Sequence, residues 1–243
     1  MKQILIICLS LFSFCTSNAF TLNSSTNPDL KGWSDSNVQL YVNTANCPAG
    51  IDVPSIISGA VAVWNNVPTS SIKVSYDGTT TSTTMSGPTT VYCETNFQSV
   101  VGADQNSVPG AAAVNGTSGR ITQGILYLNA SVGQANIGNF DQTLLKVILA
   151  HEIGHILGLG HSQSTKALMY YDASAKNTLS LSQDDIDGMS YLYPSDEISD
   201  KKFAGCGLVK SLPPPTSGKM NLIFLIMLLP FTIYLGLRNL KLT

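Results

Sequence analysis

The apolar and polar positions divide the chain into two apolar ends and a middle built of short alternating segments and longer helical ones. Four segments alternate as half-buried strands do: residues 37–43, 71–76, 110–114 and 121–129. Asp77-Gly78 predicts a turn after the second of these, and residues 115–119 predict a turn between the last two. The Ser/Thr-rich residues 79–90 predict a loop.

Three segments place apolar residues at helical spacing: residues 52–65, 141–157 and 181–192. The segment that begins at Asp141 is apolar nearly all round, so we expect it to run through the core. The last segment is capped by Ser182 and carries acidic residues in its first turn, where they favour a helix. Strands followed by two helices predict the α+β class.

The N-terminus has the features of a secretory signal peptide over residues 1–19. Lys2 precedes an apolar run from Ile4 to Phe14 that is too short to span a bilayer. Ser17 and Ala19 form a small-x-small site, which predicts cleavage after Ala19. We therefore expect an exported protein that is secreted or held at the cell surface, and one domain over residues 20–199.

The C-terminus combines a Gly/Cys motif and a Pro-rich linker (200–220) with an apolar segment and a basic tail (221–243). The arrangement around Cys206 resembles bacterial C-terminal sorting signals, which implies a bacterial source and a tail that is cut near Cys206. A permanent single-span anchor explains the same residues, and the sequence leaves both open. In either case we expect attachment to a membrane through this apolar helix.

Composition argues against nucleic-acid binding, and the cysteines indicate where a disulfide could form. The charged fraction is 12% and the net charge −2, so the strong basic patch of a nucleic-acid-binding protein is missing. Once the signal peptide is removed, three cysteines remain. In an oxidising compartment Cys47 and Cys93 are the candidates for a disulfide, and Cys206 is left over for a role in sorting.

The strongest chemical signal is His151-Glu152-Ile-Gly-His155-Ile-Leu-Gly158-Leu-Gly-His161. His151 and His155 are four residues apart on a predicted helix, so their imidazoles point from one face to one metal ion. Gly158 can adopt a positive φ, end the helix and turn the chain, which lets His161 return as the third ligand. Three nitrogen ligands leave a fourth zinc position for water, as in catalytic sites.

Glu152 follows the first histidine, so we expect its carboxylate beside that fourth position. There it can act as general base on the attacking water and pass the proton to the leaving amine. Two other interpretations are a core helix with hydrogen-bonded histidines and a zinc ion that only stabilises the fold. The three matched offsets count against the first, and the open position with Glu152 counts against the second.

This motif resembles that of the metzincin metallopeptidases, and within them the matrixins, whose catalytic domains are zincin-like. Residues 167–170 resemble the Met-turn under the zinc, and residues 181–193 resemble the final matrixin helix. The resemblance implies a twisted mixed β-sheet with an active-site helix and a C-terminal helix. It also implies His151, His155 and His161 as ligands of one catalytic Zn²⁺, Glu152 as the base and Met169 as a hydrophobic floor.

Several departures from the family pattern change the expected cofactors. The second, structural zinc of typical matrixins is bound by three histidines. All three histidines here belong to the catalytic motif, so we expect no second zinc site of that kind. Ca²⁺ sites are common in the family, and Asp77, Asp104 and Asp172 are candidates. Tyr171 occupies a place that is usually Pro in matrixins. In astacin-like and serralysin-like relatives a Tyr there helps to hold the oxyanion; otherwise Tyr171 is a surface or pocket-wall aromatic.

These observations predict a zinc-dependent endopeptidase that cleaves extracellular polypeptides as a monomer. An extended substrate should lie along an edge strand, for which residues 110–114 are the candidate. The family implies an apolar P1′ pocket near the Met-turn. Two alternatives from other classes are a catalytically idle surface adhesin on a metzincin scaffold and a structural envelope protein whose main feature is its sorted tail.

Overall fold

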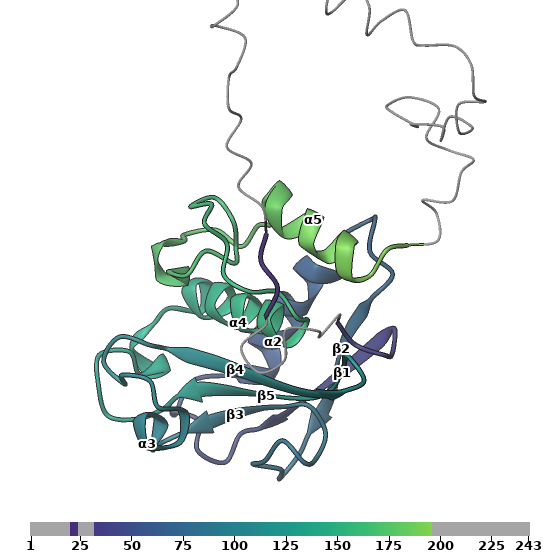
Figure 1. The fold of residues 1–243 in the computed structure, drawn as a ribbon. Helices are drawn as coiled ribbons and strands as arrows, with labels where there is room; N and C mark the ends of the chain where they lie inside the picture. Colours follow the sequence, from purple (N-terminus) through teal and green to yellow (C-terminus); the bar gives the residue numbers. More distant parts are fainter. Residues whose placement is uncertain (1–19, 24–31, 196–243) are drawn as a thin grey trace, which may run out of the picture. The chain divides into compact units, whose positions relative to one another are not determined.

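The computed structural model of the chain describes residues 20–23 and 32–195 (Figure 1). They belong to the first of two units into which the chain divides, Met1–Ser199 and Asp200–Thr243. The predicted signal peptide, the Gly/Cys motif with Cys206, and the apolar segment 221–243 lie outside the described residues. Within the described part of the chain, no helix is both long and apolar enough to cross a membrane.

A five-stranded mixed sheet with the order β2-β1-β3-β5-β4 forms one layer of the domain. Its strands are β1 (Asn37–Asn43), β2 (Lys73–Thr79), β3 (Thr90–Glu94), β4 (Gly110–Thr117) and β5 (Arg120–Asn129). β1 pairs in parallel with β2 and β3, and β3 pairs in parallel with β5. β4 is antiparallel to β5 and occupies an edge of the sheet. The prediction of an α+β fold with a mixed sheet is confirmed.

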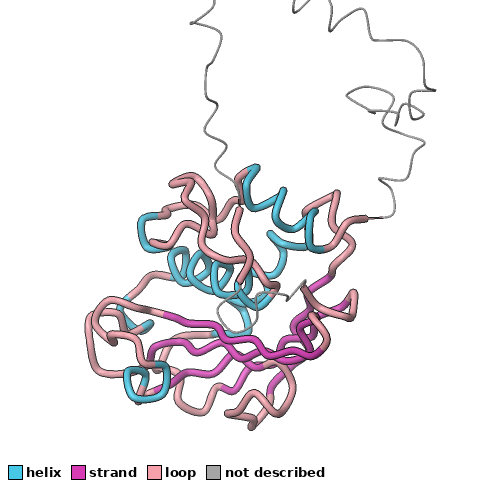
Figure 2. The backbone as a smooth tube through the Cα atoms, in the orientation of Figure 1, coloured by secondary structure: helices cyan, strands magenta, loops and turns pink. Residues whose placement is uncertain are grey.

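The helices are α2 (Val53–Asn65), α3 (Phe97–Val101), α4 (Gln142–Ile156) and α5 (Gln183–Leu192), with two 3₁₀ turns, η1 (Ile137–Asn139) and η2 (Ala173–Ala175). Helices α2, α4 and α5 lie over one face of the sheet, whereas α3 lies apart from them near the end of β3 (Figures 1 and 2). Helices α2 and α4 pack on each other, and α4 also contacts β4 and β5. In Figure 1, α5 lies beyond α4 on the side away from the sheet.

Helix α4 runs through the core, as its apolar sequence predicts. Asp141 caps its N-terminus by accepting a hydrogen bond from the Leu144 amide at 2.9 Å. The buried Trp64 of α2 packs against it and donates from Nε1 to the carbonyl oxygen of Ala150 at 2.9 Å. This bond satisfies the indole N–H in the core, so α2 fixes the position of the middle of α4.

Three local features differ from the sequence-based expectations. Strand β3 and the short helix α3 were not predicted, and β2 continues through Asp77-Gly78 to Thr79 instead of turning there. All five residues of β3 are buried because the strand lies between β1 and β5, so it lacks the alternation that marks a half-exposed strand. Gly78 has a φ of 111°, which a glycine accommodates within an edge strand.

A disulfide joins Cys47, in the segment after β1, to Cys93 of β3. The two Cα atoms are 5.0 Å apart, a normal separation for this bond. Cys93 is fully buried beside the core. The bond therefore ties the segment between β1 and α2 to the centre of the sheet.

Candidate metal centre

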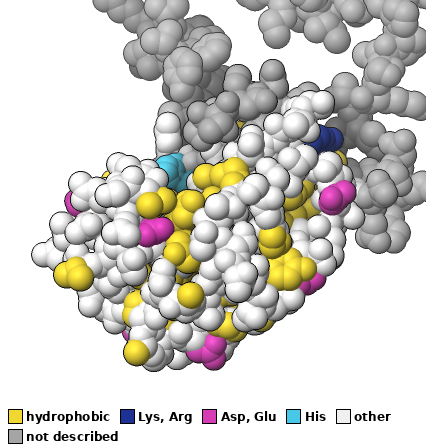
Figure 3. All heavy atoms as spheres, turned by 90° about the horizontal axis from the view of Figure 1, so that it is seen from below, with side chains coloured by type: hydrophobic (Ala, Val, Ile, Leu, Met, Phe, Trp, Pro, Cys, Tyr) yellow, Lys and Arg dark blue, Asp and Glu magenta, His cyan; other side chains and the backbone are white. Residues whose placement is uncertain are grey.

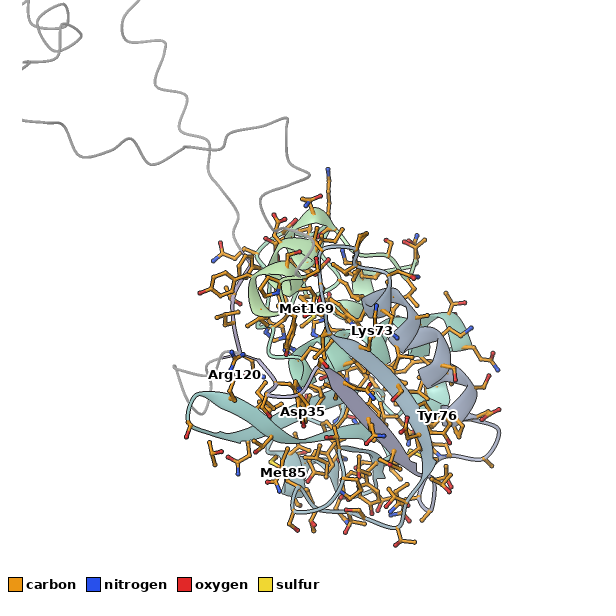
Figure 4. All side chains as sticks on the ribbon, turned by 90° about the vertical axis from the view of Figure 1, so that its right-hand side faces the viewer. Asp35, Lys73, Tyr76, Met85, Arg120 and Met169 are labelled. Carbon is orange, nitrogen blue, oxygen red and sulfur yellow. A yellow bond between two sulfur atoms is a disulfide. The ribbon has the colours of Figure 1, made fainter. Side chains whose placement is uncertain are left out.

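Helix α4 presents His151, Glu152 and His155 from its C-terminal half. Gly154 lies between the two histidines, where a Cβ atom would stand 2.3 Å from the Met169 sulfur. The missing side chain therefore lets Met169 pack directly against the helix behind the histidines. Figure 4 shows Met169 inside the helical part of the domain, and its side chain is buried.

The third histidine reaches the same point through a turn at Gly158. This glycine has a φ of 98°, in the left-handed region predicted for it, and the helix ends just before it at Ile156. The Nε2 atom of His155 lies 3.1 Å from Nε2 of His151 and 3.2 Å from Nε2 of His161. Among the described residues, these three form the one group of three or more His, Cys, Asp or Glu side chains that could hold a metal ion.

The hydrogen bonds of the two helical histidines fix which nitrogen faces the centre. His151 Nδ1 lies 2.8 Å from the carbonyl oxygen of Leu168, and His155 Nδ1 lies 2.8 Å from that of Leu159. A carbonyl only accepts, so each Nδ1 carries the proton and each Nε2 carries a bare lone pair. Two lone pairs 3.1 Å apart repel each other unless a cation lies between them.

The spacing of the nitrogens fits a zinc ion. Zn–N bonds of about 2.0–2.1 Å in a tetrahedron place the nitrogens about 3.3 Å apart, close to the distances found here. Backbone carbonyls that accept from the outer ring nitrogen are the usual support of metal-binding histidines. The three-histidine group therefore fits a zinc site with one position left for another ligand.

Burial keeps His151 and His155 neutral and raises the pKa of Glu152. It lowers the pKa of His151 to about 4 and that of His155 to about 3, so both are neutral at pH 7. Burial also raises the pKa of Glu152 to about 8. A carboxyl with a pKa near neutrality suits proton transfer in both directions.

Gly110, the first residue of β4, makes room for Glu152. A Cβ atom there would stand 3.0 Å from Cγ of Glu152 and 3.3 Å from its Oε1. Strand β4 and helix α4 therefore approach each other directly at the carboxylate. A side chain at position 110 would have to push Glu152 aside.

The Met-turn is held by one buried carboxylate. Asp185 of α5 accepts from the amides of Leu168 and Met169 at 2.8 and 3.0 Å. It also accepts from the amide and hydroxyl of Ser182 at 2.7 and 2.9 Å, which caps its own helix. Because Leu168 in turn accepts from His151, Asp185 connects α5 to a metal ligand through one peptide group.

Two aromatic side chains, from Trp33 and Tyr193, hold the C-terminal end of α4 by hydrogen bonds. Tyr193 donates from its hydroxyl to the carbonyl oxygen of Leu157 at 2.5 Å, and Trp33 donates from Nε1 to that of Ile156 at 2.7 Å. These bonds satisfy helix carbonyls that the turn leaves without partners. They hold the helix end from which the chain turns to His161.

A cavity of about 620 Å³ opens over the three histidines and Glu152. It is lined on one side by residues 107–112, which are the end of the loop before β4 and the start of that strand, and elsewhere by residues 21–23, Gly160 and residues 171–173. Figure 3 shows histidine atoms at the surface of this face, beside apolar side chains. The exposed histidine is His161.

The remaining site candidates lie in different places. Tyr171 lines the cavity, but 66% of the residue is exposed and its ring contacts Tyr170 at a centroid distance of 4.4 Å. Of the calcium candidates, Asp77 accepts from Gln39, and Asp104 accepts from the Asn106 amide and the Ser107 hydroxyl. Asp172 stands at the cavity wall, so the three carboxylates do not form one site.

Sequence reasoning missed the supporting residues of the site. A glycine inside a helix costs about 1 kcal/mol relative to alanine, so Gly154 between two ligands carried a signal of close packing. Asp185 was interpreted only as an acidic residue in the first turn of a helix. Its contact with the Met-turn depends on how α5 packs on α4, which no local pattern encodes. The same holds for Gly110 beside Glu152.

Comparison with known proteins gives one family and several relatives. A family model described as Matrixin matches residues 33–194. The chain is 36% identical over 78 residues to Metalloendoproteinase 2-MMP of Arabidopsis thaliana, which covers 29% of this chain and 21% of the relative. It is 42% identical over 78 residues to Stromelysin-1 of Mus musculus, covering 31% and 16%. It is 47% identical over 55 residues to Interstitial collagenase of Bos taurus, covering 23% and 12%. The matched parts span about a fifth or less of these relatives' length.

Proposed function

The chain belongs to the matrixin family, and from this premise we propose that it is a zinc-dependent endopeptidase that hydrolyses peptide bonds of extracellular proteins. The observation that carries the proposal is the convergence of three histidine Nε2 atoms beside a buried glutamate in an open cavity. A metal site that only stabilised the fold would have no need of a cavity with a carboxylate at its wall.

His151, His155 and His161 would hold the metal through their Nε2 atoms, and the Nδ1 hydrogen bonds of His151 and His155 orient two of the three rings for this. When bound, the zinc supplies a Lewis acid that polarises the scissile carbonyl and makes a water more acidic. Glu152 takes the proton from the attacking water and donates it to the leaving amine. Its burial in the wall of the cavity keeps bulk water from competing for that proton.

The peptide substrate lies extended along β4. This strand is at the edge of the sheet, and its residues Gly110, Ala111 and Ala112 line the cavity. A free strand edge offers backbone groups to an added strand, and small side chains leave space for those of the substrate. On the other side, residues 171–173 form the wall next to the Met-turn, where an apolar P1′ side chain would enter.

We also propose that the enzyme acts outside the cytosol, secreted or tethered to the cell surface. The Cys47–Cys93 disulfide supports this, because such bonds persist in oxidising compartments. The signal peptide and the C-terminal segment provide the route for export and attachment. N-terminal sequencing and mass spectrometry of the exported protein test both ends: cleavage after Ala19 is expected, and a retained residue 1 contradicts the signal peptide.

The activity is tested by digestion of a peptide library with the full chain, with and without a chelator. Cleavage that disappears on chelation and returns with one equivalent of zinc is expected. Glu152→Gln should lower kcat by about 10²–10⁴ while zinc binding is kept, because only the proton acceptor is removed. Glu94→Gln is the matched control, since Glu94 is also buried but does not line the cavity.

The same variants distinguish the proposed endopeptidase from a catalytically idle adhesin. An adhesin would show no chelator-sensitive cleavage by the wild-type chain, and Glu152→Gln would leave its binding unchanged. A wild-type chain that binds one zinc ion per molecule but cleaves no library peptide contradicts the proposed function.

A further inference from the structure

Residues 20–23 lie beside the turn that carries the third histidine. Leu22 forms an antiparallel bridge with Leu159. The amide of Asn23 donates to the carbonyl oxygen of Gly158 at 2.8 Å, and the amide of Gly160 donates to that of Thr21, also at 2.8 Å. The turn from α4 to His161 is therefore paired, residue by residue, with a segment from the other end of the domain.

This pairing matters because His161 is held differently from the other two ligands. His151 and His155 each donate from Nδ1 to a backbone carbonyl, which fixes the ring. For His161, no such bond joins Nδ1 to any residue in the described ranges, and the side chain is exposed. The position of this ligand depends on its own backbone.

The backbone of His161 has a specific partner in Thr21. The Thr21 hydroxyl donates to the carbonyl oxygen of His161 at 2.7 Å. The two segments approach closely, since a Cβ atom on Gly160 would stand 2.5 Å from Thr21 Oγ1 and 2.7 Å from the carbonyl oxygen of Leu22. Thr21 thus bonds to two backbone groups of the turn. Its carbonyl oxygen accepts from the Gly160 amide, and its hydroxyl donates to the His161 carbonyl oxygen.

We propose that Thr21 is a positioning residue for the third metal ligand, and that residues 20–23 are part of the metal centre. In this role the segment fixes the peptide from which the His161 ring extends. The proposal rests on the zinc site of the proposed function. It does not depend on which peptides the enzyme cleaves.

The test compares three variants of the full chain. Thr21→Val removes the hydroxyl but keeps the shape and the backbone carbonyl that accepts from Gly160, and Thr21→Ser keeps the hydroxyl. Thr90→Val is the matched control, because Thr90 also donates to a carbonyl, that of Pro88, at 2.7 Å, but lies outside the cavity. Zinc affinity is measured by competition with a chromophoric chelator, and ligand geometry by the visible absorption of the cobalt-substituted protein.

Thr21→Val should weaken zinc binding by about five-fold, the loss expected from one hydrogen bond, and should change the cobalt spectrum. Thr21→Ser and Thr90→Val should behave as the wild type in both measurements. Unchanged affinity and spectrum in Thr21→Val would overturn the proposal, and so would an equal loss in Thr21→Ser or in Thr90→Val. These readouts need no turnover, so a wild type that binds zinc without cleaving peptides would refute the proposed function alone.

Discussion

The cavity has a helical side and a sheet side, and the two differ in chemistry. The helical side carries every titratable group that lines the cavity: the three histidines and Glu152, with Tyr171 and Asp172 at the wall. The sheet side, residues 107–112, contributes only small or apolar residues and one serine. The titratable groups thus come from one stretch of chain, residues 151–172, while the sheet side supplies shape and a free strand edge.

The two sides are also held by different means. On the helical side the supporting bonds are buried, such as those that Asp185 accepts from Leu168 and Met169. On the sheet side the loop before β4 is held by Asn129, which donates from Nδ2 to the carbonyl oxygens of Gln105 and Val108. Changes on the helical side should therefore alter stability and zinc binding, and changes on the sheet side should alter catalysis alone.

Acid should produce the largest effect, because only the helical side titrates. The pKa values of about 4 for His151 and about 3 for His155 lie below the value of about 6.5 for an unfolded histidine. Below pH ~6.5 the unfolded chain therefore binds two more protons at these histidines than the folded one, whereas the raised pKa of Glu152 lets the folded chain keep one proton that the unfolded chain loses. The two histidines outweigh the single carboxyl, so stability falls as the pH approaches those values. The chelated protein should keep its fold at pH 7 and lose it towards pH 4 in a circular dichroism titration. A thermal midpoint that is constant between pH 7 and 4 would contradict the neutral, buried ligand pair.

Asp185→Asn should produce the next largest effect. The amide group replaces an acceptor with a donor that faces backbone N–H groups, which should cost about 2–4 kcal/mol in the free energy of unfolding. Because Leu168 then loses its fixed position next to His151, zinc affinity should fall by about ten-fold or more. Urea unfolding and chelator competition measure the two quantities.

Asp187→Asn is the matched control for that variant, since Asp187 is exposed on the same helix and bonds only to Gln183 among the hydrogen bonds identified. Its stability should change by less than about 0.5 kcal/mol. If the two variants behaved alike, the connection from α5 to the metal centre would be refuted.

Gly110 lies where the sheet side meets Glu152 of the helical side, and Gly110→Ala should change catalysis alone. The new methyl group would stand 3.0 Å from Glu152 Cγ, so the carboxylate must shift by a few tenths of an ångström. We expect kcat to fall by about ten-fold with zinc affinity unchanged, since misplaced catalytic groups lose rate. In the control Gly59→Ala the new methyl meets only Lys146 carbons at 3.5 Å, and kcat should stay at the wild-type value. Loss of zinc in Gly110→Ala would show that the two sides are not separable.

Tyr171→Phe should have the smallest effect. The ring is largely exposed at the cavity wall, so loss of its hydroxyl should change kcat/KM by less than about three-fold. Kinetics on one cleaved peptide suffice for the measurement. A loss of a hundred-fold in kcat with unchanged KM would instead assign the hydroxyl to the oxyanion, as in the astacin-like relatives.

The sequence predicted the candidate ligands and the edge strand at residues 110–114 better than the contacts that support them, for physical reasons. Ligands four residues apart on a helix and a glycine turn are local features, so the motif from His151 to His161 could be interpreted without knowledge of the fold. The N-cap Asp141 and the capping Ser182 were local as well, and both cap in the structure.

The features that the sequence did not reveal depend on contacts between distant segments. β3 is a central strand of five buried residues, too short and too uniform to give a pattern. The pairing of residues 20–23 with 158–161 brings together segments more than a hundred residues apart, and a stretch with two polar residues in four gave no sign of it. Supporting residues such as Asp185 and Gly110 become visible only once the elements are packed.

The central claim is that three imidazoles bind one zinc ion beside Glu152. A crystal structure of the zinc-loaded protein, with anomalous data on both sides of the zinc absorption edge, tests it most directly. We expect a single anomalous peak at about 2.0–2.1 Å from Nε2 of His151, His155 and His161, with the Glu152 carboxylate next to a free coordination position. A peak elsewhere, or a fourth position filled by a side chain of the protein itself, would contradict it.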